Sequence, residues 1–432
     1  MTQKLTFAQL DLSQEIQKAV SSLGYEETTP IQSVAIPVVL SGKDVIGQAM
    51  TGSGKTAAFV IPMLERIQVN SKQVQGLIMC PTRELAIQVS LEVGKIGKFF
   101  HGLHAVPVYG GQPIDRQIKA LRQGASIVIG TPGRILDHIS RKTINFSQVK
   151  MVVLDEADEM LNMGFRDDIE EILRKTPSER QTLLFSATMP APILQLAKKY
   201  QRDPEIIRAA HDKVTVPSIE QFYYEVRSQE KMDVLANILD MHNPKLSIVF
   251  CNTKRKVDDV AYDLKARGYG AEAIHGDMSQ QKRTRVMDRF RKGTVDILVA
   301  TDVAARGIDV ANIEAIFNYD VPQDEESYVH RIGRTGRAGK TGKAFSLVSG
   351  RDMYKFRDIK RYTKANIIKG DNPSMKNVEE AKGNLIIDSI KKQISEKNLD
   401  LQVQMVESML KQDYTSLDIA AALLRMYMKK KQ

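Results

Sequence analysis

The feature that most constrains the fold of this chain is an internal repeat with a period of about 170 residues. Three pairs of segments resemble each other in the same order: 76–83 (GLIMCPTR) with 247–254 (SIVFCNTK), 108–111 (VYGG) with 274–277 (IHGD), and 126–131 (SIVIGT) with 296–301 (DILVAT). Self-similarity at a nearly constant offset indicates repeated structural units. Because the period is far longer than a solenoid repeat, the sequence predicts two related domains.

Each repeat alternates short apolar runs with longer stretches of helical periodicity. In the first repeat the apolar runs are 45–46, 77–79, 127–129, 152–154 and 183–185. Runs without polar alternation are typical of strands in a parallel sheet that is covered on both faces. Strands that alternate with helices indicate right-handed βαβ units, in which ligands bind at the carboxyl ends of the strands. We therefore expect an α/β fold with two parallel-sheet lobes and a linker.

Changes of pattern along the chain predict where the domains begin and end. We expect an N-terminal lobe at 1–208, a polar linker at 209–218, a second lobe at 219–365 and a small all-helical domain at 375–432. In the last segment apolar residues recur at helical spacing, and Thr415 with Asp418 predicts a helix cap. A tail this small buries too little apolar surface alone, so we expect it to dock on a lobe or on a second copy.

Composition narrows the class of protein. With 42% hydrophobic and 26% charged residues, a disordered or fibrous chain is excluded. Two cysteines, Cys80 and Cys251, exclude a disulfide scaffold and a four-cysteine zinc site and indicate a reducing compartment, so we expect the cytoplasm. No apolar run is long enough for a membrane helix, and the first residues lack a signal-peptide pattern. The net charge of +10 favours a polyanionic partner, although no segment is a polybasic arm.

Residues 48–56 (QAMTGSGKT) have the context of a phosphate-binding loop, because they follow one apolar run and open a helical pattern. Gly52 and Gly54 allow backbone N–H groups to turn toward phosphate oxygens, and a helix N-terminus adds a favourable dipole. Lys55 would reach the β- and γ-phosphates, and the Thr56 hydroxyl would bind Mg²⁺. The alternative is a glycine-rich turn with an exposed lysine, which the strand-before, helix-after context disfavours.

Asp155 and Glu156 follow a second apolar run about a hundred residues later. Asp155 is placed to hold Mg²⁺, and Glu156 to orient or deprotonate the attacking water. Two acidic residues after a strand are most often a solvated loop, and it is the phosphate loop that favours the catalytic interpretation.

Residues 155–158 read DEAD, and with them the chain resembles the DEAD-box ATP-dependent RNA helicases over about residues 5–365. The other matching segments, in order, are 29–32 (TPIQ), 81–86 (PTRELA), 110–111 (GG), 131–134 (TPGR), 186–188 (SAT), 249–252 (VFCN), Gln280 with Arg283, 300–302 (ATD) and 330–337 (HRIGRTGR). Tyr25 and Ala49 are small departures. The resemblance implies two RecA-like lobes, ATP and Mg²⁺ as cofactors, and RNA as a partner that is bound without sequence specificity.

The resemblance also implies a role for each matching residue. The nucleotide-binding residues would be Phe7, Tyr25, Gln32, Thr51, Gly52, Ser53, Gly54, Lys55, Thr56, Gly307 and Asp309. The catalytic residues would be Lys55, Glu156, Arg334 and Arg337, with Mg²⁺ held by Thr56 and Asp155. The RNA contacts would be Pro81, Thr82, Arg83, Gly110, Gly111, Thr131, Pro132, Gly133, Arg134, Asn252, Gly276, Asp277, Arg283 and Thr301. Hydrolysis would be coupled to lobe movement by Asp158, Ser186, Thr188 and His330.

Physical chemistry supports part of this assignment independently. The amide of Gln32 offers donors and acceptors that match the N6/N7 edge of adenine, whereas the alternative is a surface glutamine after a proline turn. Tyr25 either stacks on adenine or is a half-buried core aromatic. Arg334 and Arg337 would act as arginine fingers, worth about 10³–10⁵ in rate, if the lobes close. The alternative is a basic helix face with surface ion pairs, which we expect of Arg331.

The remaining expectations for the two lobes concern RNA binding and His330. RNA binding without sequence specificity needs contacts to phosphate and 2′-OH, for which residues 81–83, 110–111 and 131–134 supply backbone N–H groups and two arginines, although Gly110-Gly111 alone would be an ordinary turn. The helix after Gly133 would point its N-terminus at a phosphate and, by the resemblance, bend the strand. His330 would hydrogen-bond across the lobes, with Asp302 or Asp309 near, or else be a satisfied structural histidine.

The sequence therefore predicts an ATP-dependent RNA helicase that separates short duplexes by ATP-driven lobe closure and strand bending, with RNA-stimulated hydrolysis. An ATP-dependent RNA clamp that scarcely unwinds, and a DNA-directed helicase, are the alternatives. The tail resembles the dimerisation region of cold-shock DEAD-box helicases of Gram-positive bacteria, which implies a homodimer. The same resemblance implies a role in cold shock, RNA decay or ribosome assembly, with proteins of RNA decay or ribosome assembly as partners. We expect the basic extension of those proteins to be absent or truncated here.

Overall fold

The computed structural model describes residues 5–49, 52–208, 219–305, 310, 312–336, 340–396, 399–412 and 414–430. They form two compact units, one of residues 1–235 and 244–372 and one of residues 236–243 and 373–432. The larger unit contains two sheets, and we call the chain around each sheet the first lobe (up to residue 208) and the second lobe (219–372). The predicted site residues Thr51, Gly307, Asp309 and Arg337 and the predicted linker at 209–218 lie outside the described residues.

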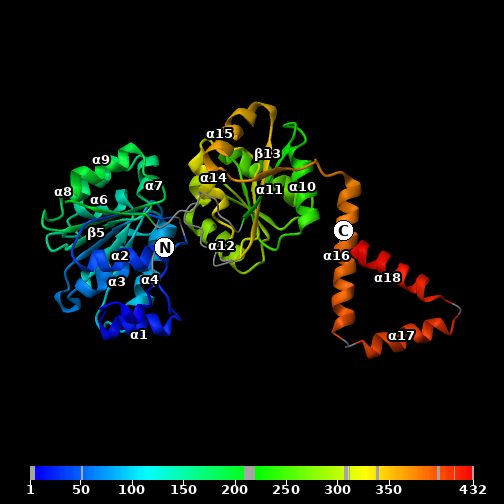
Figure 1. Cartoon of the computed structure of the whole chain (residues 1–432), viewed down its shortest axis with the longest axis horizontal. Coiled ribbons are helices and arrows are strands. Elements are labelled where there is room, and N and C mark those ends of the chain that lie inside the picture. The colour runs from blue at the N-terminus through cyan, green and yellow to red at the C-terminus, as the bar shows by residue number, and fades with distance from the viewer. Residues whose placement is uncertain are drawn as a thin grey trace. The chain divides into compact units, whose positions relative to one another are not determined.

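The first lobe alternates strands and helices, as Figure 1 shows in blue to green. Its strands are β1 (Val45–Gln48), β2 (Gly76–Met79), β3 (Ala105–Val108), β4 (Ile127–Gly130), β5 (Met151–Leu154), β6 (Gln181–Ser186) and β7 (Glu205–Arg208). Its helices are α1 (Gln14–Ser22), α2 (Pro30–Leu40), α3 (Lys55–Arg66), α4 (Arg83–Ile96), α5 (Ile114–Arg122), α6 (Pro132–Ser140), α7 (Ala157–Asn162), α8 (Arg166–Arg174) and α9 (Ala191–Tyr200), with short 3₁₀ turns at Phe7–Gln9 and Val69–Ser71.

The second lobe repeats this alternation. Its strands are β8 (Ile219–Glu225), β9 (Ser247–Phe250), β10 (Ala271–Ile274), β11 (Ile297–Ala300), β12 (Ala315–Asn318), β13 (Gly342–Val348) and β14 (Ile367–Lys369). Its helices are α10 (Lys231–His242), α11 (Lys254–Ala266), α12 (Gln280–Arg291), α13 (Asp302–Ala305), α14 (Glu325–Ile332) and α15 (Met353–Thr363), with a 3₁₀ turn at Gly350–Asp352. Because β14 pairs with β8, this sheet continues past residue 365, the boundary that the sequence suggested.

The two sheets have the same topology. The strand order is β3-β4-β2-β5-β6-β1-β7 in the first lobe and β10-β11-β9-β12-β13-β8-β14 in the second, so each strand of the first lobe has a counterpart seven strands later. Every pairing between neighbouring strands of these sheets is parallel. The prediction of two related parallel-sheet lobes is therefore confirmed, and the three repeated sequence segments fall on β2/β9, β3/β10 and β4/β11.

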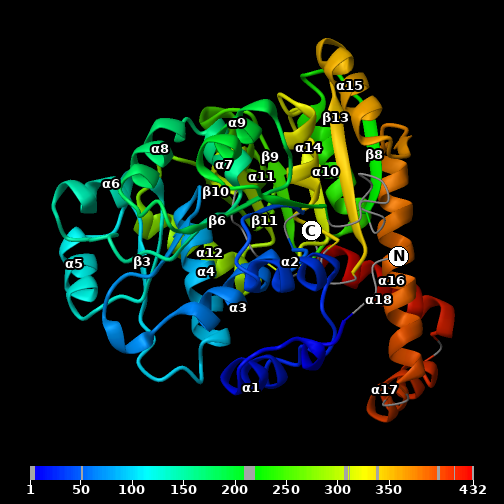
Figure 2. The same cartoon turned by 60° about the vertical axis from the view of Figure 1, so that its left-hand side comes forward.

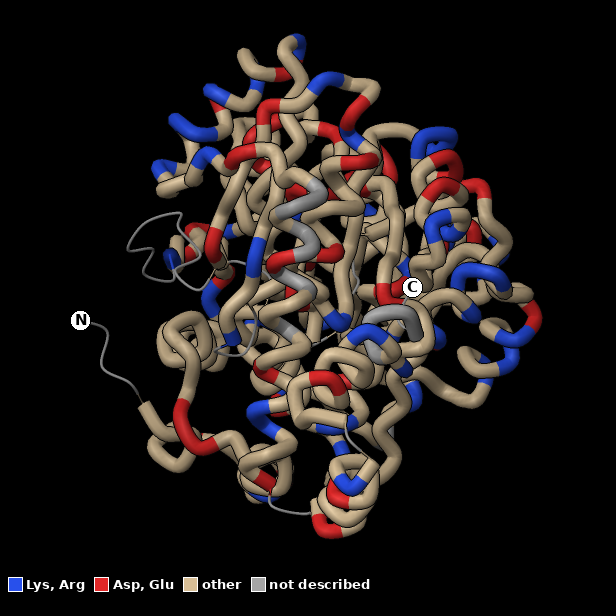
Figure 3. The backbone as a smooth tube through the Cα atoms, turned by 90° about the vertical axis from the view of Figure 1, so that its right-hand side faces the viewer, with Lys and Arg blue, Asp and Glu red and all other residues tan. Residues whose placement is uncertain are grey.

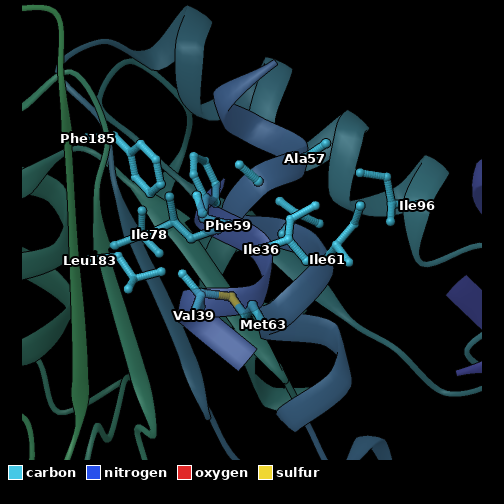
Figure 4. Packing of buried hydrophobic residues seen from close by; sticks show 14 of the residues in the cluster. Ile36, Val39, Ala57, Phe59, Ile61, Met63, Ile78, Ile96, Leu183 and Phe185 are labelled. Atoms are coloured by element: carbon cyan, nitrogen blue, oxygen red, sulfur yellow. The ribbon is translucent and has the colours of Figure 1, made fainter. Parts of the chain in front are cut away.

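Alternate residues of one buried strand supply two separate cores. In β2, Ile78 packs into the core on the side of α2 and α3, whereas Leu77 and Met79 pack into the core on the other side of the sheet. Successive side chains of a strand point to opposite faces, so an unbroken apolar run is what a doubly covered strand needs. Figure 4 shows the first of these cores, in which Phe59 and Met63 of α3 face the strands and Ile61 lies on the side of Ile36 and Ile96, among the helices.

Besides the second part of α10, the smaller unit contains the helices α16 (Met375–Ser395), α17 (Asp400–Leu410) and α18 (Ser416–Lys430) among its described residues. The predicted cap of the last helix is confirmed, because the backbone N–H of Thr415 donates to the carboxylate of Asp418 (3.2 Å) and the N–H of Asp418 donates to the Thr415 hydroxyl (3.1 Å). Among the described residues, no helix combines the length and apolar character that a membrane span requires.

Candidate active site and RNA-binding surface

The phosphate loop lies between the end of β1 and the start of α3. Gly52 and Gly54 both have positive φ angles, 84° and 91°, a region that residues with a Cβ rarely adopt. At Gly54 a side chain would also run into the Gln32 amide and the Thr29 hydroxyl. The glycines therefore let the backbone turn sharply and pack closely just before the N-terminus of α3.

Lys55 is the first residue of α3 and carries the clearest sign of a missing ligand. Its side chain is buried, yet its Nζ atom has no hydrogen-bond partner among the residues that the structure describes. An unpaired buried ammonium group is costly unless an anion compensates it. The residues present therefore fit a nucleotide phosphate beside the helix N-terminus.

Gln32 lies against this loop rather than on an open surface. Its Nε2 donates to the carbonyl oxygen of Gly54 (3.0 Å), and its Oε1 accepts from the backbone N–H of Thr29 (2.9 Å). One N–H and one lone pair of the amide remain for a ligand. The surface-glutamine alternative is wrong, because Gln32 is buried, and adenine recognition stays a prediction.

The two aromatic residues assigned to the nucleotide stack on each other. The rings of Phe7 and Tyr25 are 6.0 Å apart with planes 28° apart, and Phe7 belongs to the buried core. The Tyr25 hydroxyl donates to Glu92 (3.0 Å), and burial together with the charge of Glu92 raises the pKa of Tyr25 to about 12. Tyr25 thus has the position of a half-buried core aromatic, and its contact with adenine stays a prediction.

Asp155 and Glu156 lie at the carboxyl end of β5. Burial raises the pKa of Asp155 to about 6, although the charge of Lys55 opposes the shift. Glu156 has a left-handed backbone, φ 50° and ψ 51°, which is a strained conformation for a residue with a side chain. A bound divalent cation would compensate the buried Asp155 carboxylate, so Asp155 with Thr56, the second residue of α3, fits the predicted Mg²⁺ site.

Asp158 joins this acidic segment to the strand beside it. Its carboxylate accepts from both the backbone N–H and the hydroxyl of Thr188, each at 2.9 Å. The Ser186 hydroxyl donates to the Thr188 carbonyl (2.7 Å), which fixes the turn after β6. The Thr188 hydroxyl also lies 3.4 Å from Glu326 of α14 in the second lobe. A change at Asp158 therefore reaches the second lobe through one side chain.

His330 makes a second contact of this kind. Its Nδ1 lies 2.6 Å from Oε1 of Glu159 in the first lobe, and Asp302 lines the same small cavity of about 20 Å³ but is not its hydrogen-bond partner. Burial lowers the pKa of His330, but the hydrogen bond and charge of Glu159, with the charges of Asp158 and Glu156, outweigh it, so the pKa is raised. The protonated imidazole is therefore favoured in this arrangement.

Arg334 lines this cavity too, whereas Arg331 has a different role from the one expected. The prediction of surface ion pairs for Arg331 is wrong, because only 1% of the residue is exposed. Its guanidinium binds both carboxylate oxygens of Asp302 at 2.5 and 2.7 Å and also donates to the side chain of Asn252 at 2.8 Å. The Asn252 amide in turn donates to the Val321 carbonyl (3.0 Å), so this predicted RNA contact is held inside the lobe.

The sheet order separates two groups of predicted residues in the first lobe. The phosphate loop, the acidic segment and the coupling segment 186–188 follow β1, β5 and β6, which are neighbours on one side of the sheet. The segments assigned to RNA follow β2, β3 and β4, which are neighbours on the other side. In the second lobe the counterparts β9, β10 and β11 are followed by Asn252, Gly276 with Asp277, and Thr301. Each lobe thus gathers its predicted RNA contacts on one half of its sheet.

Two contacts join the lobes on this half. Arg83 donates to Gln280 Oε1, and Arg283 Nη2 lies 2.9 Å from the carboxylate of Glu84. Gly111, with φ 85°, leaves no room for a Cβ beside the guanidinium of Arg83. The predicted contact residue Arg83 is therefore also part of an interface between lobes. Asp277, at the rim, pairs with Lys254 (2.6 Å).

Sequence reasoning missed several residues of the site. Glu159, Glu326 and Glu84 all pair across the lobes, and Gln117 and His138 form a buried polar network beside the predicted RNA segments. The one available signal was a polar residue, Gln117, on the otherwise apolar buried face of α5. Glutamates beside a recognised motif carry no comparable signal.

Comparison with known proteins agrees with this geometry. Residues 29–196 match the DEAD/DEAH box helicase family, residues 230–339 the helicase conserved C-terminal domain, and residues 373–432 the RNA helicase DeaD dimerization domain. The structure resembles that of S. cerevisiae Dbp5 bound to RNA and ADP BeF3, with a TM-score of 0.78 and 31% identity over 87% of this chain and 99% of that one. It also resembles Mss116p bound to ssRNA and AMP-PNP, with a TM-score of 0.77 and 29% identity over 91% and 87%.

Two RecA-like lobes with this paired set of motifs define the class, and the chain belongs to the DEAD-box ATP-dependent RNA helicases. Within that family it is similar to proteins named DEAD-box ATP-dependent RNA helicase CshA. It is 50% identical to the one from Geobacillus kaustophilus over 421 residues, which are 98% of this chain and 90% of that protein. It is 49% identical to the one from Bacillus subtilis over 422 residues, 98% and 85% respectively. The chain is thus an RNA helicase of the CshA type.

Proposed function

We propose that this helicase separates short RNA duplexes locally, because ATP and RNA together hold its two lobes in a closed arrangement. The observation that carries the proposal is the pair of contacts that join the lobes on each half of the site. Thr188–Glu326 and Glu159–His330 lie on the ATP half, and Arg83–Gln280 and Glu84–Arg283 on the RNA half. A ligand that strengthens either set favours the other, so ATP and RNA each raise the affinity for the other.

On the ATP half the residues have complementary tasks. Lys55 and the backbone of the phosphate loop hold the β- and γ-phosphates, while Gln32, and Tyr25 with Phe7, are assigned to the adenine side. A Mg²⁺ ion held by Thr56 and Asp155 would neutralise charge on the phosphate oxygens. The Glu156 carboxylate orients the attacking water and accepts its proton at Oε, in a backbone geometry that is fixed before substrate binds.

The second lobe completes this half only when the lobes close. Arg334, with Arg337, stabilises the charge that develops on the γ-phosphate, and Asp309 with Gly307 contacts the ribose. Arg331 takes no part in this step, since its guanidinium is committed to Asp302 and Asn252. Its role is to hold the ends of β9, β11 and β12 together and so to position α14, which carries His330.

On the RNA half, contacts to phosphates and 2′-hydroxyls hold one strand and ignore its sequence. The first lobe contributes Arg83, the Gly110-Gly111 turn and the N-terminus of α6, where Thr131 is the N-cap and Pro132 the first helical residue. Basic and acidic positions are interspersed over the backbone (Figure 3), which suits placed contacts better than a diffuse cationic arm. Bending of the strand at α6 would then separate a short duplex.

The tail supports a homodimer. Most of the apolar side chains described in the tail are exposed in the single chain, including Leu401, Met405 and Leu423 at 65%, 62% and 56%. A second copy that packs against this face would bury it, in agreement with the match to a dimerization domain. We further propose that the protein acts in the cytoplasm, in cold shock, RNA decay or ribosome assembly, as its similarity to the CshA proteins suggests.

The decisive test of coupling is the Glu156→Gln variant. It keeps the size and hydrogen-bonding reach of the side chain but removes the base, so the closed state forms and does not turn over. With ATP and Mg²⁺ it should hold a labelled RNA strand at least about tenfold longer than the wild type does, with hydrolysis reduced by about 10²–10⁴-fold. Release of RNA from this variant as fast as from the wild type would contradict the proposal.

A further inference from the structure

Gln117 lies between the two first-lobe segments that we assign to RNA. It belongs to α5, is 1% exposed, and its helix lies beside α6 near β3 (Figure 2). On one side of it is the turn that carries Gly110 and Gly111, and on the other is the first turn of α6 with Arg134. Because the residue is buried, its effect on a strand at the surface must pass through these two segments.

The side-chain amide of Gln117 uses its full hydrogen-bonding capacity. Its Nε2 donates to the carbonyl oxygen of Tyr109 (2.9 Å) and to Oε1 of Gln112 (2.8 Å), the residues that flank the two glycines. Its Oε1 accepts from Nη1 of Arg134 (3.4 Å) and from Nε2 of His138 (3.0 Å), both on α6. An amide has two N–H hydrogens and two lone pairs, so both donors serve one segment and both acceptors serve the other.

The surrounding groups fix the orientation of this amide. The Tyr109 carbonyl can only accept, so nitrogen must face it and oxygen must face α6. The hydrogen of His138 then lies on Nε2, and Nδ1 accepts from the Thr143 hydroxyl (2.7 Å). Burial and the neighbouring Arg134 charge lower the pKa of His138, which keeps the imidazole neutral in this network. A second link, from Arg134 to the Gln112 carbonyl (3.2 Å), closes the connection.

We propose that Gln117 is a positioning residue for RNA, which holds the Gly110-Gly111 turn and the N-terminus of α6 at a fixed spacing so that both bind phosphates of the same strand. The inference rests on the proposed function, because it takes these two segments to be RNA contacts. Two independent segments would each lose orientational freedom on binding. A pair that is already held in place binds without that cost.

Gln75 provides a matched control. It is also a buried glutamine of the first lobe, at 2% exposure, and its amide makes three hydrogen bonds, with the Gln68 backbone and the Ser71 hydroxyl. It lies just before β2, at the amino end of the sheet and away from the predicted RNA segments. Gln117→Leu and Gln75→Leu therefore remove comparable buried hydrogen bonds, and only the first should affect RNA.

The experiment measures binding of a fluorescent oligouridine by anisotropy over a range of salt concentrations, and ATP hydrolysis over a range of RNA concentrations. For Gln117→Leu we expect the half-saturating RNA concentration to rise about tenfold and the KM for ATP to stay within about twofold. The salt slope of log affinity should fall by about 0.7 for each phosphate that the variant no longer binds. Gln75→Leu should change none of these. A loss of stability alone would leave the salt slope unaltered.

Gln117→Glu tests the acceptor role of the amide oxygen separately from the donor role of the amide nitrogen. It retains oxygen acceptors for Arg134 and His138 but has no N–H for the Tyr109 carbonyl, so we expect a smaller rise of about threefold in the half-saturating RNA concentration. If Gln117→Leu does not fold, Gln117→Glu makes the same comparison with Gln75→Leu. Wild-type affinity and salt slope in folded Gln117 variants, or an equal effect in the control, would overturn the inference. The wild-type response to RNA reports separately on the proposed function.

Discussion

The two lobes have the same strand topology, but the lysines at the equivalent position of each lobe differ in their hydrogen-bond partners. Lys55 starts α3 after β1, and Lys231 starts α10 after the counterpart strand β8. Lys231 donates to the Tyr319 carbonyl (2.7 Å) and lies 3.5 Å from Asp320, whereas Lys55 has no hydrogen-bond partner among the described residues.

The difference extends to the acidic residues. Tyr319 and Asp320 follow β12 where Asp155 and Glu156 follow β5. In the second lobe the chain satisfies its own lysine with these groups, so the position has become part of the packing. In the first lobe the lysine is available to a ligand, and the acidic residues would serve a cation and a water molecule. The fold thus supplies equivalent positions in both lobes, and charge pairing decides which of them are sites.

The largest expected effect comes from a comparison of Arg331, which lies in α14, with Arg334, which lies in the turn after that helix. Arg334→Ala should reduce RNA-stimulated hydrolysis by about 10³-fold or more, because it removes an arginine finger. Arg331→Met should instead destabilise the protein by about 3–5 kcal/mol, because it leaves Asp302 without its partner. Steady-state ATPase rates and thermal melting of both variants check this, and equal losses of rate at full stability would contradict the division.

The second expected effect comes from a comparison of Lys55 with Lys231. Lys55→Met should lower hydrolysis by about 10²–10³-fold and leave stability unchanged or higher, because it removes an unpaired buried charge. Lys231→Met should cost about 1–3 kcal/mol of stability and leave the KM for ATP unaltered, because its partners lie within the second lobe. An effect of Lys231→Met on ATP affinity as large as that of Lys55→Met would remove the distinction between the lobes.

A smaller effect follows from the contact between His330 and Glu159. The pKa of His330 is raised above its usual 6.5 by this contact, so the stabilisation is complete below about pH 6.5 and is lost as the pH rises through the raised value. With a non-hydrolysable ATP analogue and saturating Mg²⁺, which keeps Asp155 ionised, RNA affinity should fall by about threefold to tenfold toward pH 8.5. Glu159→Gln should flatten this profile, and an equally steep profile in that variant would contradict it.

The smallest effect on catalysis concerns the tail. The pair of substitutions Leu401→Glu and Met405→Glu places charges on its exposed apolar face and should convert a dimer to a monomer in analytical ultracentrifugation. Hydrolysis per chain should stay within about twofold, because the ATP site lies in the larger unit. A wild-type protein that is monomeric at micromolar concentration would contradict the dimer.

Much of the fold could be predicted because apolar runs such as 152–154 allow few structures other than a buried strand. Glycines and charged residues that follow such runs also located the phosphate loop and the acidic segment. The partners of individual side chains could not be predicted, since they depend on which strands become neighbours. Arg331 and Arg334 are only three residues apart in the sequence. Asp302, which follows β11, binds the guanidinium of Arg331 and assigns that residue to structure, whereas Arg334 lines the cavity beside His330.

Gln117 is a second residue whose partners could not be predicted from the sequence. Its sequence neighbours mark it only as a polar residue on a buried helix face, and its importance comes from four partners on two different segments. Such a convergence is a property of tertiary structure.

The central claim is that the two halves of the ATP site come into register when RNA joins the lobes, and the most direct test is steady-state ATP hydrolysis with and without RNA, for the wild type and for Arg334→Lys. We expect RNA to raise the wild-type rate at least about tenfold and to have almost no effect on the variant, whose shorter-reaching cation lacks the planar fork. A wild-type rate that is equally high without RNA would contradict the account.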